Sequence, residues 1–162
     1  MSMTTFYREL EAFLKVADGP FGVLQNAIDG KVLTLLGLDP ENTQAADDFQ
    51  RLEVMRSKRC GLVVYGATGQ NNTADSSDDS LDASLDFSVL LLMDPHWGGR
   101  AFGERKWRQL MVLEDLIKVL NGGEVKPAPS NCQNSVRVVS WTPEAIEGLN
   151  AWAVICRRRI KI

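Results

Sequence analysis

Two short apolar segments flank a long polar one in the middle of the chain, and this arrangement restricts the fold more than any other feature. The first segment, "RCGLVVYG" (59–66), is compact, β-branched and bounded by glycines, which is typical of a buried strand. The second, "LDFSVLLLMD" (85–94), alternates apolar residues with period two and becomes apolar on both faces at its far end. We therefore predict a β-hairpin over residues 59–94 that is covered on both faces at one end.

The segment between these strands, "ATGQNNTADSSDDSLDAS" (67–84), is small, polar and acidic. It has almost nothing apolar to bury, so we expect a long flexible loop. Its acids could suggest a calcium site, but they lack the glycine at the sixth position and the glutamate at the twelfth that an EF-hand loop requires. A solvated acidic loop without a metal is the prediction; the acids are Asp75, Asp78, Asp79 and Asp82.

The residues before the hairpin are expected to be mainly helical. Apolar residues recur every three or four positions over 4–17, and a second stripe of this kind runs from Val23 to Leu36. The two predicted helices make residues 1–38 a helical N-terminal part, with Gly30 as a point where the second helix can break. Residues 41–58 are ambiguous between a short helix and a strand around residues 52–55.

The segments after the hairpin give one helix and two strands. A wide apolar stripe predicts a helix over residues 104–121, ended by Gly122 and Gly123. The segments "NSVRVVSW" (134–141) and "LNAWAVICRRRIKI" (149–162) are strand-like and are joined by "TPEAIEG". In the second of them one face is mostly apolar and the other carries the basic residues Arg157, Arg159 and Lys161.

This order of elements, α-α-(β)-β-β-α-β-β, predicts an α+β fold, because strands form hairpins and the helices are set apart. We expect one domain over residues 1–162, with a mostly antiparallel sheet of four or five strands flanked by two or three helices. A chain of 162 residues fits one domain and is long enough to fold without a metal or a disulfide.

Composition narrows the function classes. The formal charge of −3 gives no bulk attraction to nucleic acid or to an anionic membrane. The longest apolar run, Val89–Met93, is far short of the ~20 residues of a membrane span, and the first residues lack the apolar core of a signal peptide. Three scattered cysteines, Cys60, Cys132 and Cys156, indicate reduced thiols in a cytoplasmic protein.

The best candidate for a chemical centre is "DPHWGGRAFGERKW" (94–107), which holds the only histidine. A general base needs an orienting partner, and the local backbone directs Asp94 away from His96, so we expect a solvated turn residue. The glycines lack the spacing of a phosphate-binding loop. We interpret the stretch as a structural connection and predict no catalytic, cofactor-binding or metal-binding residue and no enzyme. The alternative is a small-ligand-binding or enzymatic domain that uses His96 and Arg100.

Three quoted segments, taken in order, carry a resemblance. In "RCGLVVYGAT" a basic residue precedes an aliphatic run and a Tyr-Gly. In "LDFSVLLLMDPHWGGRAFGERKWRQLMVLEDLIKVLNG" a strand leads through a glycine-rich connection to a long helix that ends in Leu-Asn-Gly, and "EGLNAWAVICRRRIKI" is a closing aromatic-aliphatic strand. This pattern resembles the Mu-type phage tail proteins that act as tail terminators or tail-completion proteins. It covers about residues 20–162; the first nineteen residues have no match in it.

The resemblance implies a structural protein that works by binding. It implies a ring, typically a hexamer, on the head-proximal end of the tail tube, which stops tube growth and offers a surface for joining to the head. The implied partners are further copies of the chain, tail-tube proteins and head-completion proteins, in the cytoplasm during assembly and then in the virion tail. The alternative is another head–tail joining or tail-tube-like virion protein.

A ring of this kind needs heterologous interfaces, in which one patch meets a different patch on the next subunit. Open sheet edges are adhesive, so strand 149–162 and loop 67–84 are our candidates. We predict that the acids of the loop contact the basic residues of the last strand of an adjacent subunit, which gives orientation more than affinity. The basic face lacks interleaved aromatic residues, so we do not expect direct or sequence-specific nucleic-acid binding.

Overall fold

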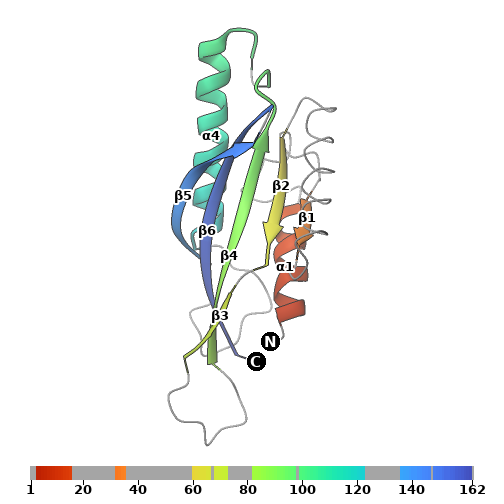
Figure 1. Cartoon of the computed structure of the whole chain (residues 1–162), viewed down its shortest axis with the longest axis vertical. Helices are drawn as coiled ribbons and strands as arrows, with labels where there is room; N and C mark the ends of the chain where they lie inside the picture. Colours follow the sequence, from red (N-terminus) through yellow and green to blue (C-terminus); the bar gives the residue numbers. More distant parts are fainter. Residues whose placement is uncertain are drawn as a thin grey trace, which may run out of the picture.

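The computed structural model describes residues 3–15, 32–35, 60–66, 68–72, 82–97, 99–122, 136–146 and 148–161. These ranges confirm the α+β class, with two described helices against a sheet (Figure 1). The elements are α1 (Met3–Lys15), β1 (Val32–Leu35), β2 (Cys60–Tyr65), β3 (Gly69–Asn71), β4 (Asp82–Met93), α4 (Phe102–Leu120), β5 (Arg137–Ile146) and β6 (Leu149–Lys161).

The sheet has the strand order β1-β2-β4-β6-β5, and the short strand β3 also pairs with β4. Among the described strands only β1 and β2 run parallel; the other pairs are antiparallel. Strands β4 and β6 pair along their whole length, from Asp82 opposite Lys161 to Met93 opposite Asn150. They form the long axis of the molecule in Figure 1.

The predicted hairpin exists, but its loop is shorter than expected. Strand β3 and the first residues of β4 pair with each other, and the Asn72 N–H donates to the Asp82 carbonyl at 2.8 Å. The prediction of an unpaired loop over 67–84 is therefore wrong at both ends. The reason is that backbone pairing needs no apolar side chain, and the residues of β3 are exposed. Residues 73–81, with Asp75, Asp78 and Asp79, lie outside the described residues.

One face of the sheet carries the main core, and both described helices pack on it. Every second residue of β4 from Ala83 to Met93 is buried there, as the period-two pattern predicted. Helix α1 contributes Phe6 and Tyr7, whose rings contact Phe87 at centroid distances of 5.5 and 6.3 Å. Helix α4 contributes a stripe of buried residues: Val112, Leu113, Leu116, Val119 and Leu120.

The opposite face of the sheet carries a second, smaller core cluster. It is made of Val63, Leu90, Leu92, Leu149, Ala151 and Ala153, all of them buried. The far end of β4 is thus buried on both faces, which confirms the prediction drawn from its apolar run.

Two predicted boundaries are corrected. Val32 and Leu35 were expected in a helix but lie in β1, which runs beside β2 with Val32 opposite Leu62. The remainder of the second predicted helix, and the strand predicted around residues 52–55, lie outside the described residues. Strand β5 continues to Ile146 instead of ending at 141, because Gly148, with φ +80°, allows a tight turn into Leu149.

The prediction for the terminal strand is also wrong. It was predicted to be an adhesive edge, but β6 lies between β4 and β5 and is paired on both sides. Its apolar face also includes a charge: Arg158 is only 1% exposed, and its guanidinium lies 5.3 Å from the centroid of the Phe6 ring. Among the described strands, the outer positions belong to β1 and β5.

Candidate functional site

The stretch that holds the only histidine forms a turn. The Asp94 carboxylate accepts a hydrogen bond from the His96 N–H at 2.8 Å, and the Asp94 carbonyl accepts one from the Trp97 N–H at 3.0 Å. These bonds end β4 and direct the chain toward α4. His96 itself is exposed in this turn, as predicted. The geometry is that of a structural connection.

Gln109 of α4 holds this connection in place. Its Nε2 donates to the carbonyls of Asp94 and Trp97, at 3.0 Å each, and its Oε1 accepts from Asn150 Nδ2 at 2.8 Å. One buried side chain thus joins the helix, the turn and the beginning of β6. Gln109 is not among the residues predicted from the sequence; the available signal was a polar residue on the same helix side as Leu113 and Leu116.

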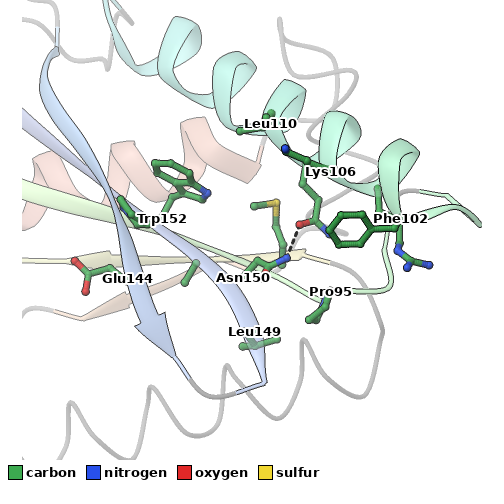
Figure 2. Close-up of a pocket in the computed structure, with 13 residues that line it drawn as sticks. Pro95, Phe102, Lys106, Leu110, Glu144, Leu149, Asn150 and Trp152 are labelled. Atoms are coloured by element: carbon green, nitrogen blue, oxygen red, sulfur yellow. Dashed lines mark hydrogen bonds between the residues drawn. The ribbon is translucent and has the colours of Figure 1, made fainter.

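A groove of about 450 Å³ opens beside this amide. Figure 2 shows Phe102, Lys106 and Leu110 of α4 on one side of it and Leu149, Asn150 and Trp152 of β6 on the other. The remaining lining residues are Met93, Pro95, Arg105, Gln109, Pro143, Glu144 and Ala151. Most of the lining is apolar, with cationic side chains along the helix side.

The helix side of the groove is electropositive. Arg105 donates from Nη1 to the Arg100 carbonyl at 3.0 Å, while its Nε is buried and has no hydrogen-bond partner among the described residues. Within the described ranges, neither Arg105 nor Lys106 forms an ion pair with a carboxylate. The N-cap residue Ala101 supplies no side-chain cap, and the acidic Glu104 in the first turn offsets part of the positive potential of the helix start.

Large apolar side chains are exposed on α4 and β5, two of the elements that contribute residues to the groove. Phe102 and Trp107 of α4 are 75% and 65% exposed, and Met111 is about half exposed. On β5, Val139 and Trp141 are also about half exposed. Of the large apolar side chains exposed among the described residues, only Met3 lies elsewhere. Tryptophan, phenylalanine and methionine are enriched at protein–protein interfaces, which makes this side of the molecule the candidate binding surface.

The basic residues predicted to bind a neighbouring subunit have partners in their own chain. Arg157 forms a bidentate pair with Asp86, at 2.7 and 3.1 Å, and Arg159 Nε donates to Asp82 Oδ1 at 2.9 Å. The antiparallel register explains both pairs, because it sets the acids of β4 beside the cations of β6 on one face. The hydrogen bond from Arg157 holds the pKa of Asp86 below its usual value.

Asp82, one of the acids of the predicted contact between subunits, belongs to β4 and is bonded to Arg159 of the same chain. Lys161 lies opposite Asp82 in the register, and its side chain is outside the described set. A contact of the other loop acids with a neighbour stays a prediction.

The two described cysteines belong to the core. Burial raises the pKa of the Cys60 thiol and of the Cys156 thiol to about 12 each, and the charge of Asp94 adds to the effect at Cys60. Both thiols are therefore neutral and poor nucleophiles. Cys132 lies outside the described residues. In the described part of the chain no cluster of three potential metal ligands occurs, and no helix is both long and apolar enough to cross a membrane.

No model of a protein family matches this chain, and no curated protein matches it in sequence. One solved structure, of a protein whose name describes no activity, is similar with a TM-score of 0.52 and 13% identity, over 97% of this chain and 94% of that chain. A second, from the virion of a native gene transfer agent particle, gives a TM-score of 0.43 and 16% identity, over 97% and 92%. The first likeness is one of fold alone.

Proposed function

We propose that this chain is a structural subunit of a phage or prophage tail, which acts by binding to copies of itself and to other virion proteins and not by catalysis. The observation that carries the proposal is that five of the six large apolar side chains exposed among the described residues, three of them Trp or Phe, lie on α4 and β5. Such a surface suits a permanent neighbour better than solvent. The resemblance of the sequence to Mu-type tail proteins supports the same conclusion.

The specific role that we propose is that of a tail terminator. Identical subunits form a closed ring, which we expect to be a hexamer, that caps the tail tube and connects it to the head. A ring is built from heterologous contacts, and the exposed apolar side chains of α4 and β5 supply one of the two patches that such a contact needs. The alternative function that the same surface would suit is that of a head–tail joining or tail-tube-like protein.

The contact is made by side chains more than by strand addition. The register of strand β5 shifts between Val138 and Ser140. Farther along the same strand, Pro143 lies opposite Trp152. Because proline has no N–H, its nitrogen must face the open side of β5, where it removes a donor that an added strand would need. Both features protect an edge from pairing with another strand.

Light scattering at several protein and salt concentrations tests the proposal. We expect one assembly of fixed mass that forms as the concentration rises. The double variant Trp107→Ser and Trp141→Ser should raise the concentration needed by at least about tenfold, which corresponds to about 1.4 kcal/mol. Met3→Ser, an exposed apolar residue on α1, is the matched control and should assemble like the wild type.

Two other outcomes would change the conclusion. A mass that grows without limit would indicate open, tube-like polymerisation and favour the tail-tube reading over the ring. A strict monomer at every concentration, together with no binding to isolated tail tubes, would remove the structural role.

A further inference from the structure

The chain itself contains a segment whose composition suits the groove. We propose that the groove between α4 and the β5–β6 hairpin receives the acidic segment 73–81 of a neighbouring copy, and this inference rests on the proposed function. The contact is head-to-tail: the groove of one subunit holds the segment between β3 and β4 of the next.

The chemistry of the groove defines what it binds. Its lining is mainly apolar, and Arg105 and Lys106 of α4 place two cations along one side. Glu144 is the one carboxylate of the lining, and in Figure 2 its carboxylate points away from Lys106. The buried Nε of Arg105 lacks a hydrogen-bond partner among the described residues, and carboxylate is the partner that a guanidinium prefers. An acidic segment with an apolar side chain therefore suits this groove.

Segment 73–81, "TADSSDDSL", has that composition. It contains Asp75, Asp78 and Asp79, no basic residue, and the apolar Leu81 at its end. Its acids are complementary in charge to the helix side of the groove, and its serines and threonine suit a partly hydrated contact.

Distance rules out binding to the groove of the same subunit. Asp82 begins β4 and Met93, which lines the groove, ends it. Eleven steps along a strand cover roughly 36 Å. Asp79 is three residues from Asp82, and Asp75 is three residues from Asn72, which is bonded to Asp82; three residues reach at most about 11 Å.

The strand ends to which the segment is attached and the groove thus lie at opposite ends of the molecule, as the positions of β3 and of the beginning of α4 in Figure 1 show. Two complementary patches at opposite ends form a heterologous contact, which closes into a ring when the rotation allows. Arg157 and Arg159 are weaker candidates as receptors, because Asp86 and Asp82 of their own chain already neutralise them.

Charge reversal tests the contact in the full chain. Lys106→Glu changes an exposed groove residue, and Asp78→Lys changes the segment. We expect each variant to require at least about tenfold more protein than the wild type to assemble, with an unchanged melting temperature. Lys118→Glu, an exposed lysine in the last turn of the same helix, is the control and should assemble normally.

Combination of the two changes gives the decisive result. The double variant that carries both Lys106→Glu and Asp78→Lys should recover assembly, because the two exchanged charges attract each other across the same contact. An equimolar mixture of the two single variants should also assemble at the wild-type concentration, since alternating subunits restore an attractive pair at every contact, although each variant alone needs more protein.

The failures are distinguishable. Wild-type assembly with normal behaviour of Lys106→Glu would overturn the groove contact and leave the ring intact. Loss of assembly in both single variants, with no recovery in the double variant or the mixture, would show that this segment is not the occupant. A wild type that never assembles, alone or on tail tubes, would overturn the proposed function and this inference with it.

Discussion

The two ends of the β4–β6 pair differ in whether their cationic side chains are paired with carboxylates of the same subunit. At the Asp82 end, Arg157 and Arg159 each bond a carboxylate that the antiparallel register sets beside them. At the Met93 end, Arg105 and Lys106 lie along a groove with no ion-pair partner among the described residues. Arg157 and Arg159, which belong to a run of basic residues in the sequence, are thus paired with carboxylates of their own subunit. Arg105 and Lys106, at the beginning of α4, have no carboxylate partner among the described residues. The proposed binding surface thus carries the cations that lack a carboxylate partner among the described residues, and not the densest basic run of the sequence.

The aromatic residues divide in the same way. Phe87 of β4 is 2% exposed and contacts Phe6 and Tyr7, whereas Phe102 at the rim of the groove is 75% exposed. One residue type therefore serves the core at one position and the surface at another. Substitutions that separate stability from assembly are the way to test this division.

The largest effect on stability is expected for Phe87→Ala. Removal of a fully buried aromatic ring costs about 3–5 kcal/mol, because the apolar contacts are lost and a cavity remains. Phe102→Ala should change the free energy of unfolding by less than about 0.5 kcal/mol and should weaken assembly. Urea denaturation and light scattering measure the two effects. If Phe102→Ala unfolded the protein as readily as Phe87→Ala, the distinction between a core ring and a surface ring would be lost.

An intermediate effect is expected for Gln109→Ala. The substitution removes three hydrogen bonds and leaves the Asp94 and Trp97 carbonyls without the amide donor. Such buried groups cost roughly 1–3 kcal/mol when they lose their partner. Asn150→Ala removes only one of the three bonds and should cost less. The free energy of unfolding of both variants provides the measurement; equal losses would mean that the carbonyl contacts contribute nothing.

Much of the fold follows from local pattern. The period-two burial of β4 and the stripe of α4 could be predicted because each element buries one continuous face. The left-handed stop after α4 is also confirmed, with Gly122 at φ +85°. These features depend on residues close in sequence, which is why they were accessible.

The errors concern pairing between distant segments. The residues "VLTL" alone do not predict that this segment pairs with β2. The residues of β6 alone do not predict that this strand is paired on both sides. The burial of Arg158 could not be predicted because the Phe6 ring that its guanidinium contacts comes from a distant part of the sequence. The partners of Arg157 and Arg159 within the chain were missed for the same reason: they lie on β4 and become visible only with the register. The groove combines residues of α4 with residues of β4, β5 and β6, and no single one of these segments indicated it.

The smallest effect is expected at the neutralised end. Asp86→Asn removes an ion pair that is largely exposed, so the loss at neutral pH should be about 0–1 kcal/mol and should shrink in high salt. The sign with pH follows from the lowered pKa of Asp86. The pair stabilises the fold above the ordinary value of 3.8 and loses this contribution as the pH falls below it, because the folded protein then binds the proton that the unfolded chain binds earlier.

Unfolding curves of wild type and Asp86→Asn should therefore converge at acid pH, while Glu114→Gln, an exposed carboxylate on α4, should match the wild type at neutral pH. Asp86→Asn also tests whether the two ends of the β4–β6 pair differ in their role in assembly. If the Asp86–Arg157 pair serves only its own subunit, Asp86→Asn should leave the assembly concentration unchanged, in contrast with Lys106→Glu. A marked shift in assembly on loss of Asp86 would return Arg157 to the interface and weaken the case for the groove.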